Sequence, residues 1–261
     1  MARFAVNLSM LFTELPLIDR FDAAAKAGFE LVEIQFPYEL SIDEIKLALQ
    51  HNNRELVLIN LPAGDWAGGE RGIACHPDRI DEFDRGLLQA LEYAEALGVK
   101  KINCLSGIKP EGISHEDAER TFARNLEQAG ETLAAHGIEL MAEAINTQDI
   151  PGFFLNRSSQ LFEIKEHYNI ENLQLQYDVY HMQIMEGNLT TTLKNNLSEV
   201  GHIQVADVPG RHEPGTGEIN FPNLFKALDA MGYSGVISLE YVPAADTLSG
   251  LTQIKPIIGG Q

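Results

Sequence analysis

Short apolar runs alternate with longer amphipathic stretches along nearly the whole chain. Most runs are continuously apolar instead of alternating between apolar and polar residues, which is typical of parallel strands covered on both faces. The stretches between them carry apolar residues at helical spacing, and several end at a glycine. The pattern predicts eight strands, at residues 4–9, 31–36, 55–60, 101–105, 138–143, 173–178, 202–206 and 236–240.

Helices are expected between these strands. Leu17, Phe21 and Ala24 share one helical face ahead of Gly28. Ser41-Ile-Asp-Glu44 forms a capping box that starts the next helix. Further helical patterns cover residues 83–98, 114–137, 158–165, 189–197 and 221–231, whereas the tail of the chain has a weak pattern.

This alternation predicts the fold class. Eight strand–helix units in 261 residues are typical of an α/β fold of the (β/α)8 TIM-barrel type. The competing architecture is a doubly wound open sheet, but the GxGxxG motif that would follow its first strand is missing. No linker or shift in composition divides the chain, so one domain is expected over residues 1–261.

Four consecutive strands end in side chains that carry oxygen, namely Glu143, Asp178, Gln204 and Glu240. The carboxyl ends of barrel strands face the active site, and neighbouring strands lie about 4.8 Å apart, so these side chains can converge. Three carboxylates that close repel one another unless a cation lies among them or protons are shared. Any one of them alone suits a solvated strand end, but four in succession predict a Mg²⁺ or Mn²⁺ site.

Three residues are candidates for binding a substrate. His181, three residues after Asp178, is placed to hydrogen-bond a substrate oxygen or that carboxylate, although a surface or loop position is an equal alternative. Arg71 lies in a long glycine-rich segment, residues 61–72, which predicts a lid or a binding loop. Arg211, seven residues after Gln204, is the second basic candidate.

Composition narrows the classes of function. Lys and Arg total 19 against 38 Asp and Glu, so the formal net charge is −19 and the basic residues form no cluster. Such a surface repels phosphate backbones, and no nucleic-acid partner is expected. No apolar run approaches the ~20 residues of a membrane span and no export signal precedes the first strand, so a soluble, cytoplasmic protein is expected. Cys75 and Cys104 are predicted to be reduced thiols. Assembly as a homo-oligomer stays open.

Several long motifs resemble the hydroxypyruvate isomerases, a family of xylose-isomerase-like barrels. They are NLSMLFTE from Asn7, FPY from Phe36, NLPAGDWAGGERGIAC from Asn60, KINCLSG from Lys101, DIPGF from Asp149, QYDVYHMQIMEGNLT from Gln176, GHIQVAD from Gly201 and EPGTGEIN from Glu213. The resemblance implies a TIM barrel in which Glu143 and Glu240 are the catalytic pair. It also implies that Glu143, Asp178, Gln204 and Glu240 bind a divalent metal. Two positions depart from the family pattern, Ala144 in place of a proline and Val242 in place of a lysine.

The expected function follows from this resemblance together with the predicted metal site. An aldose–ketose isomerase would interconvert hydroxypyruvate and 2-hydroxy-3-oxopropanoate (tartronate semialdehyde) by metal-assisted proton transfer through an enediolate, with hydride shift as the alternative mechanism. Alternative substrates are a 2-oxotetronate or a ketose epimerised at carbon 3. An apurinic endonuclease would need more histidine ligands and a basic face, and a non-catalytic sugar-binding barrel is a weaker alternative.

Overall fold

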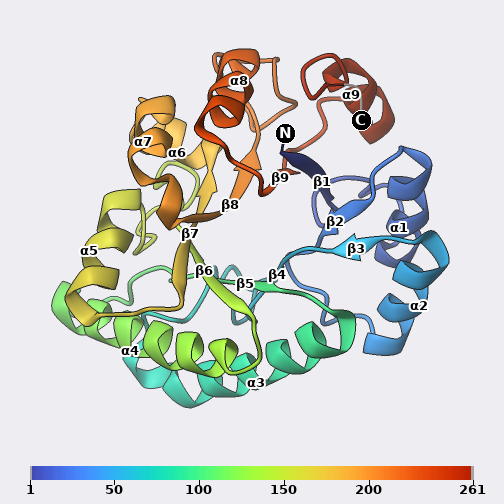
Figure 1. Ribbon diagram of the computed structural model, residues 1–261. Helices are drawn as coiled ribbons and strands as arrows, with labels where there is room; N and C mark the ends of the chain where they lie inside the picture. The colour runs from blue at the N-terminus through green and yellow to red at the C-terminus, as the bar shows by residue number, and fades with distance from the viewer. Residues whose placement is uncertain (1, 260–261) are drawn as a thin grey trace.

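The computed structural model describes residues 2–259, so the first and the last two residues of the expected domain lie outside it. Within these residues, parallel strands form one barrel-shaped sheet inside a ring of helices, as the sequence predicts (Figure 1). The order in the sheet is β3-β2-β1-β9-β8-β7-β6-β5-β4. The strands are β1 (Arg3–Asn7), β2 (Leu31–Glu33), β3 (Glu55–Leu56), β4 (Ile59–Asn60), β5 (Lys101–Cys104), β6 (Glu139–Glu143), β7 (Leu173–Asp178), β8 (Val200–Val205) and β9 (Val236–Leu239).

The helices cover the outside of the barrel and follow the strands in turn (Figure 1). The predicted capping box of Ser41 and Glu44 is confirmed. The Ser114 hydroxyl also caps a helix, by accepting from the backbone N–H of Asp117. The helices are α1 (Leu17–Lys26), α2 (Ile42–Asn52), α3 (Ile80–Leu97), α4 (His115–Ala134), α5 (Ser158–Tyr168), α6 (Val179–Met185), α7 (Leu189–Asn196), α8 (Phe221–Met231) and α9 (Thr247–Ile254), with 3-10 turns η1 (Pro77–Arg79) and η2 (Leu197–Glu199).

The third predicted strand is split into β3 and β4, which gives nine strands instead of eight within the described residues. The chain changes partner at the break, because β3 pairs with β2 whereas β4 pairs with β5. Hydrogen bonds to the β2 side nevertheless continue through the break, with Val57 N–H donating to the Val32 carbonyl at 2.9 Å. Residues 55–60 therefore still act as one segment that joins the two ends of the sheet.

The tail of weak pattern forms α9, the helix after the last strand. Asp246 caps this helix by accepting from the Ser249 N–H at 3.0 Å, and Leu251 and Ile254 are buried beneath it. The hydroxyl of Thr247 accepts from the backbone N–H of Phe12 at 2.7 Å, which ties α9 to the loop after β1. The helix was missed because only two of its residues contribute large apolar side chains to the core.

The interior of the barrel changes character along the strands. An apolar cluster that includes Leu31 and Val236, the first residues of their strands, fills the amino-terminal end. Toward the carboxyl ends the buried side chains become polar, and register places Asn7 beside Glu33 and Asp178 beside Gln204. The fold thus concentrates polar groups at the mouth where active sites of such barrels lie. Among the described residues, no helix has the length and apolar character needed to cross a membrane.

Candidate metal and substrate site

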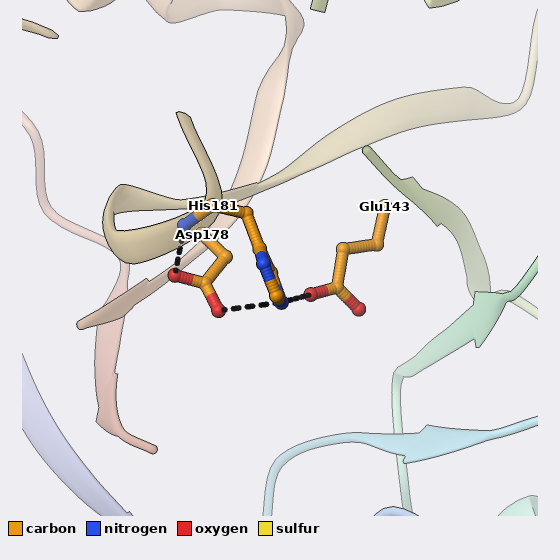
Figure 2. Close-up of side chains that lie close together, drawn as sticks. All are labelled: Glu143, Asp178 and His181. Carbon is orange, nitrogen blue, oxygen red and sulfur yellow. Dashed lines mark hydrogen bonds and ion pairs between the residues drawn. The ribbon is translucent and has the colours of Figure 1, made fainter. Parts of the chain in front are cut away.

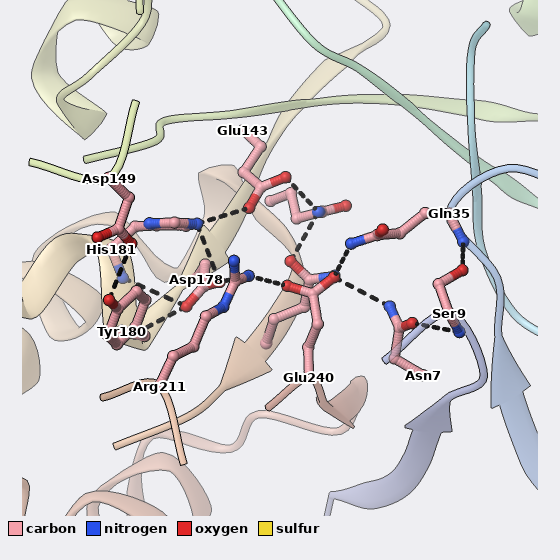
Figure 3. Close-up of polar contacts among 12 residues, drawn as sticks. Asn7, Ser9, Gln35, Glu143, Asp149, Asp178, Tyr180, His181, Arg211 and Glu240 are labelled. Atoms are coloured by element: carbon pink, nitrogen blue, oxygen red, sulfur yellow. Dashed lines mark hydrogen bonds and ion pairs between the residues drawn. The ribbon is translucent and has the colours of Figure 1, made fainter. Parts of the chain in front are cut away.

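Three carboxylates from well-separated parts of the chain meet at the mouth of the barrel (Figure 3). Glu143 ends β6, Asp178 ends β7, and Glu240 directly follows β9. Their exposed fractions are only 5%, 1% and 2%. Burial of this kind is costly for charged groups, so the cluster needs compensating donors or cations.

Glu240 has one oxygen held by the protein and one that faces the cavity. Its Oε1 accepts hydrogen bonds from the side-chain amides of Asn7 (2.9 Å), Gln35 (2.8 Å) and Gln204 (3.1 Å). Its Oε2 accepts from the Arg211 guanidinium at 2.6 Å. Because Oε1 already has three amide donors, Oε2 is the atom left for a ligand.

Glu143 and Asp178 are divided in the same way. Glu143 Oε2 accepts from Asn103 at 3.2 Å and Gln176 at 3.0 Å, whereas its Oε1 faces the His181 Nε2 at 3.8 Å. Asp178 Oδ1 caps α6 by accepting from the Tyr180 N–H at 2.7 Å, whereas its Oδ2 lies 3.6 Å from the same imidazole nitrogen (Figure 2). Glu143 Oε1 and Asp178 Oδ2 therefore face one point.

Electrostatics at the site disfavour the ionised carboxylates. Burial, together with Glu240 and Asp178, raises the pKa of Glu143 well above its usual range. Burial also raises the pKa of Glu240 to about 8, although Arg211 opposes this shift. Burial would lower the pKa of Arg211, but the carboxylates led by Glu240 outweigh it and raise that pKa. A second cation among these groups would be strongly favoured.

The donor set fits a divalent metal. One atom each of Glu143, Asp178 and His181 lies within 4.8 Å of the others, the one such group of three found in residues 2–259 (Figure 2). Glu240 reaches the same point through Arg211, whose Nη2 lies 3.4 Å from Asp178 Oδ2 and 2.6 Å from Glu240 Oε2. These carboxylates can therefore hold a divalent cation, which the sequence predicted without His181 in the set.

Gln204, the fourth predicted ligand, is the register partner of Asp178, but its amide is held by other side chains. Its Oε1 accepts from Gln176 at 2.7 Å, and its Nε2 donates to Glu33 at 2.6 Å and to Glu240. The amide nitrogen and not the oxygen thus faces the carboxylates. His202 on the same strand is fully buried, with its Nε2 2.6 Å from Glu33 Oε2.

Both predicted arginines line one cavity of about 350 Å³ above the carboxylates. Arg71 lies with its Cζ 4.3 Å from the centre of the Trp66 ring, which packs in turn on Phe36 with ring centroids 4.8 Å apart. Arg211 has a left-handed backbone, with φ of 57°, and its Cζ lies 5.3 Å from the centre of the Tyr180 ring. His181, given equal weight as a surface or loop residue, is instead 2% exposed and lies on α6.

The loop over residues 61–72 is fastened to the barrel. Glu70 is paired with Arg79, and the Leu61 N–H donates to the Asn103 carbonyl of β5 at 2.8 Å. Gly72 has φ of +116°, and a Cβ there would lie 2.5 Å from the Leu105 carbonyl oxygen, so only glycine allows this close approach. The loop therefore presents Trp66 and Arg71 to the cavity from a fixed base.

Several residues of the site were not identified from the sequence. They share one property, a polar side chain within or next to an apolar strand, and they are Asn7, Glu33, Gln35, Asn103 and Gln176. A buried polar residue that interrupts an apolar run must find a partner inside the barrel. That interruption is the signal by which they could have been found.

Comparison with known proteins shows which family this chain belongs to. A family model described as the xylose isomerase-like TIM barrel matches residues 21–256. The chain belongs to this family. Hydroxypyruvate isomerase of Escherichia coli (strain K12) is 48% identical over 256 residues, which cover 98% of this chain and 99% of the relative. The predicted resemblance to the hydroxypyruvate isomerases is thus confirmed.

Two further members of the family widen the range of named activities. 2-oxo-tetronate isomerase of Cupriavidus necator H16 is 43% identical, covering 99% of this chain and 100% of the relative. A crystal structure described as AP endonuclease, family 2, from Brucella melitensis is 42% identical, with a TM-score of 0.95 and coverage of 98% and 99%. The family therefore includes relatives of similar identity that carry different names.

Proposed function

We propose that this protein is a hydroxypyruvate isomerase, which interconverts hydroxypyruvate and 2-hydroxy-3-oxopropanoate (tartronate semialdehyde). The observation that carries the proposal is the convergence of three buried carboxylates, each with one oxygen held by amide donors and one left for a ligand. The identity with the Escherichia coli isomerase supports the choice of substrate. Two free, buried cysteines fit a reducing compartment such as the cytoplasm, and the substrate would belong to glyoxylate metabolism.

The reaction moves one proton between neighbouring carbons. Glu143 or Glu240 removes a proton from the hydroxymethyl carbon, and the electron pair forms the enediolate. A proton returns to the former carbonyl carbon, while the hydroxyl proton passes from the hydroxymethyl oxygen to the former carbonyl oxygen, which leaves an aldehyde and a new hydroxyl group. Mg²⁺ or Mn²⁺ would be held by Glu143, Asp178 and Glu240, and by Gln204 if its amide were reversed to present Oε1. The ion would stabilise the developing negative charge. Glu143 and Glu240, the two glutamates that line the cavity, are the residues we assign to proton transfer.

The direct test is conversion of hydroxypyruvate followed by NMR, with a 2-oxotetronate and a panel of ketoses as competing substrates. We expect hydroxypyruvate to be converted with the highest kcat/KM. The alternative function, 2-oxo-tetronate isomerase, is favoured by the 43% identical Cupriavidus relative. A higher kcat/KM for the four-carbon acid would replace our assignment with that one, and turnover of ketoses alone would contradict both.

Cleavage of apurinic DNA is less compatible with the chain, despite the name of its Brucella relative. The net charge of −19 opposes binding of a phosphate backbone. Within the described residues, one group of three potential ligands is found, and it holds a single histidine. A zinc cluster that cuts phosphodiester bonds would need more imidazole ligands.

We expect Arg71→Ala to raise KM for hydroxypyruvate about tenfold while kcat changes little. Arg71 lines the cavity beside Trp66 and offers a guanidinium to the substrate carboxylate, and a hydrogen bond to a charged group contributes roughly 1.5–3 kcal/mol. Steady-state kinetics measure the effect. Arg120→Ala is the matched control, because that arginine is exposed on α4 and pairs only with nearby helix carboxylates. If Arg71→Ala and Arg120→Ala have the same KM for hydroxypyruvate, Arg71 does not bind the substrate and its role is structural.

We expect metal binding to release protons at neutral pH. Burial raises the pKa values of Glu143 and Glu240, so the metal-free site holds protons that a cation must displace. The affinity for Mn²⁺ should therefore rise with pH up to about 8, the pKa of Glu240. Calorimetry in two buffers of different ionisation enthalpy counts the protons. An affinity that stays flat between about pH 6 and pH 8 would contradict this linkage.

A further inference from the structure

His181 has hydrogen-bond donors on one side of its ring. The side-chain Nδ2 of Asn146 lies 2.7 Å from the imidazole Nδ1, and the backbone nitrogen of Asn146 donates to the same atom at 3.4 Å. Both groups carry hydrogen, so Nδ1 must accept. An imidazole that carries a proton on Nδ1 would set N–H against N–H at this contact.

The orientation of the Asn146 amide is fixed by its other contacts. Its Oδ1 accepts from the backbone N–H groups of Gln148 at 3.0 Å and Asp149 at 2.8 Å. Its Nδ2 also donates to the Asp149 carboxylate at 2.9 Å, and that carboxylate is held by the Tyr180 hydroxyl at 2.8 Å. Rotating the amide by half a turn would break all three contacts and set like groups against one another.

We propose that Asn146 is a positioning residue that fixes His181 in the tautomer with its proton on Nε2. His181 then acts as a hydrogen-bond donor to a substrate oxygen and not as a metal ligand. Its Nε2 points between Glu143 Oε1 and Asp178 Oδ2, at 3.8 and 3.6 Å (Figure 2). The identity of the substrate rests on the proposed function, whereas the tautomer follows from the contacts alone.

The tautomer decides whether His181 is a metal ligand together with Glu143 and Asp178 or a hydrogen-bond donor beside the metal. Glu143, Asp178 and His181 are close enough to bind one ion together. An imidazole ligates a metal through a nitrogen lone pair, and a nitrogen that carries a proton has none to offer. If Nε2 is protonated, the metal keeps oxygen ligands only, which favours Mg²⁺ or Mn²⁺ over zinc.

Nitrogen NMR of histidine-labelled protein tests the tautomer without any activity assay. The two ring nitrogens resonate in different ranges when protonated and when bare, and His181→Gln identifies which of the eight histidines gives each signal. We expect a bare Nδ1 and a protonated Nε2 in the metal-free protein. The same signals are expected in the Mg²⁺-bound protein, because Mg²⁺ is diamagnetic and does not broaden them as Mn²⁺ would. A protonated Nδ1, in either state, would overturn the proposal.

Metal titration supplies an independent measurement. His181→Gln should change the Kd for Mn²⁺ less than about threefold, whereas Asp178→Asn should raise it about tenfold or more. If His181→Gln weakens Mn²⁺ binding as much as Asp178→Asn does, His181 is a ligand and the proposal fails. Both measurements use metal alone, so they stand even if hydroxypyruvate proves not to be the substrate.

Asn146→Asp tests the positioning residue itself. One carboxylate oxygen can still accept from the N–H groups of Gln148 and Asp149, but the other now faces Nδ1 as an acceptor and draws a proton to it. We expect the NMR signature of His181 to change to a protonated Nδ1, with kcat/KM falling about tenfold or more. Gln148→Glu, an exposed position two residues away, adds the same charge without facing His181 and should leave tautomer and activity unchanged. An unchanged tautomer in Asn146→Asp would remove Asn146 from this role.

Discussion

Glu143→Gln and Glu240→Gln are each expected to lower kcat about 100-fold or more, the usual scale of general acid–base catalysis. Amide donors hold one oxygen of each glutamate, and both side chains line the cavity. In Glu240→Gln, the amide oxygen would keep the contacts with Asn7 and Gln35, and the NH₂ group would replace Oε2. The variant should therefore fold but lack the base at the reacting carbon.

Glu213→Gln is the matched control for these two variants. Glu213 is also 2% exposed, but its carboxylate accepts from the backbone N–H of Ala244 at 3.2 Å and lies outside the group that lines the cavity. Its substitution should leave kcat near the wild-type value. Full activity in both Glu143→Gln and Glu240→Gln would exclude these residues from the chemistry.

Incorporation of solvent deuterium distinguishes proton transfer from hydride shift. In D₂O the wild-type enzyme should place deuterium on the product carbon, because a carboxyl proton exchanges with solvent during the life of the enediolate. Transfer without any incorporation would favour a hydride shift or a base shielded from water. Mass spectrometry of the product, taken before equilibrium is reached, measures the label.

The barrel could be predicted because each strand carries its own apolar run, and local patterns of this kind survive in the sequence. The split between β3 and β4 could not, since the apolar pattern over residues 55–60 is continuous and only the choice of partner changes. The last helix was missed because its stability depends on contacts far away in the chain, such as the bond between Phe12 and Thr247.

The site shows the same division between local and distant information. Glu143 and Asp178 end their strands and Glu240 directly follows one, so the general rule for barrels placed them together. The side chains that select one oxygen of each carboxylate, such as Asn103 and Gln35, come from other strands and loops. The register of the strands and the rotamers of the side chains decide which atoms pair. Neither can be predicted from the sequence of one strand. The amide orientation of Gln204 is one such detail.

Asp178→Asn is expected to raise the Kd for Mn²⁺ about tenfold or more and to lower activity in parallel. The asparagine can keep its Oδ1 as the cap of α6, accepting from the Tyr180 N–H, while its NH₂ group replaces the oxygen that faces Arg211. Asp246→Asn is the matched control, because Asp246 also caps a helix, α9, but lies on the surface. It should cost a small amount of stability and leave Kd unchanged.

Metal removal and thermal unfolding complete this prediction. Exhaustive chelation should abolish the activity of the wild-type enzyme, and Mg²⁺ or Mn²⁺ should restore it. A ligand at 100 times its Kd stabilises the folded state by about 2.7 kcal/mol, so Mn²⁺ should raise the Tm of the wild type well above that of Asp178→Asn at the same concentration. The site would be misassigned if activity survived chelation, or if the active enzyme held stoichiometric zinc. A hard cation is expected because the buried carboxylates have too little positive charge around them. Within the described residues, Arg211 is the one Lys or Arg side chain that pairs with Asp178 and Glu240.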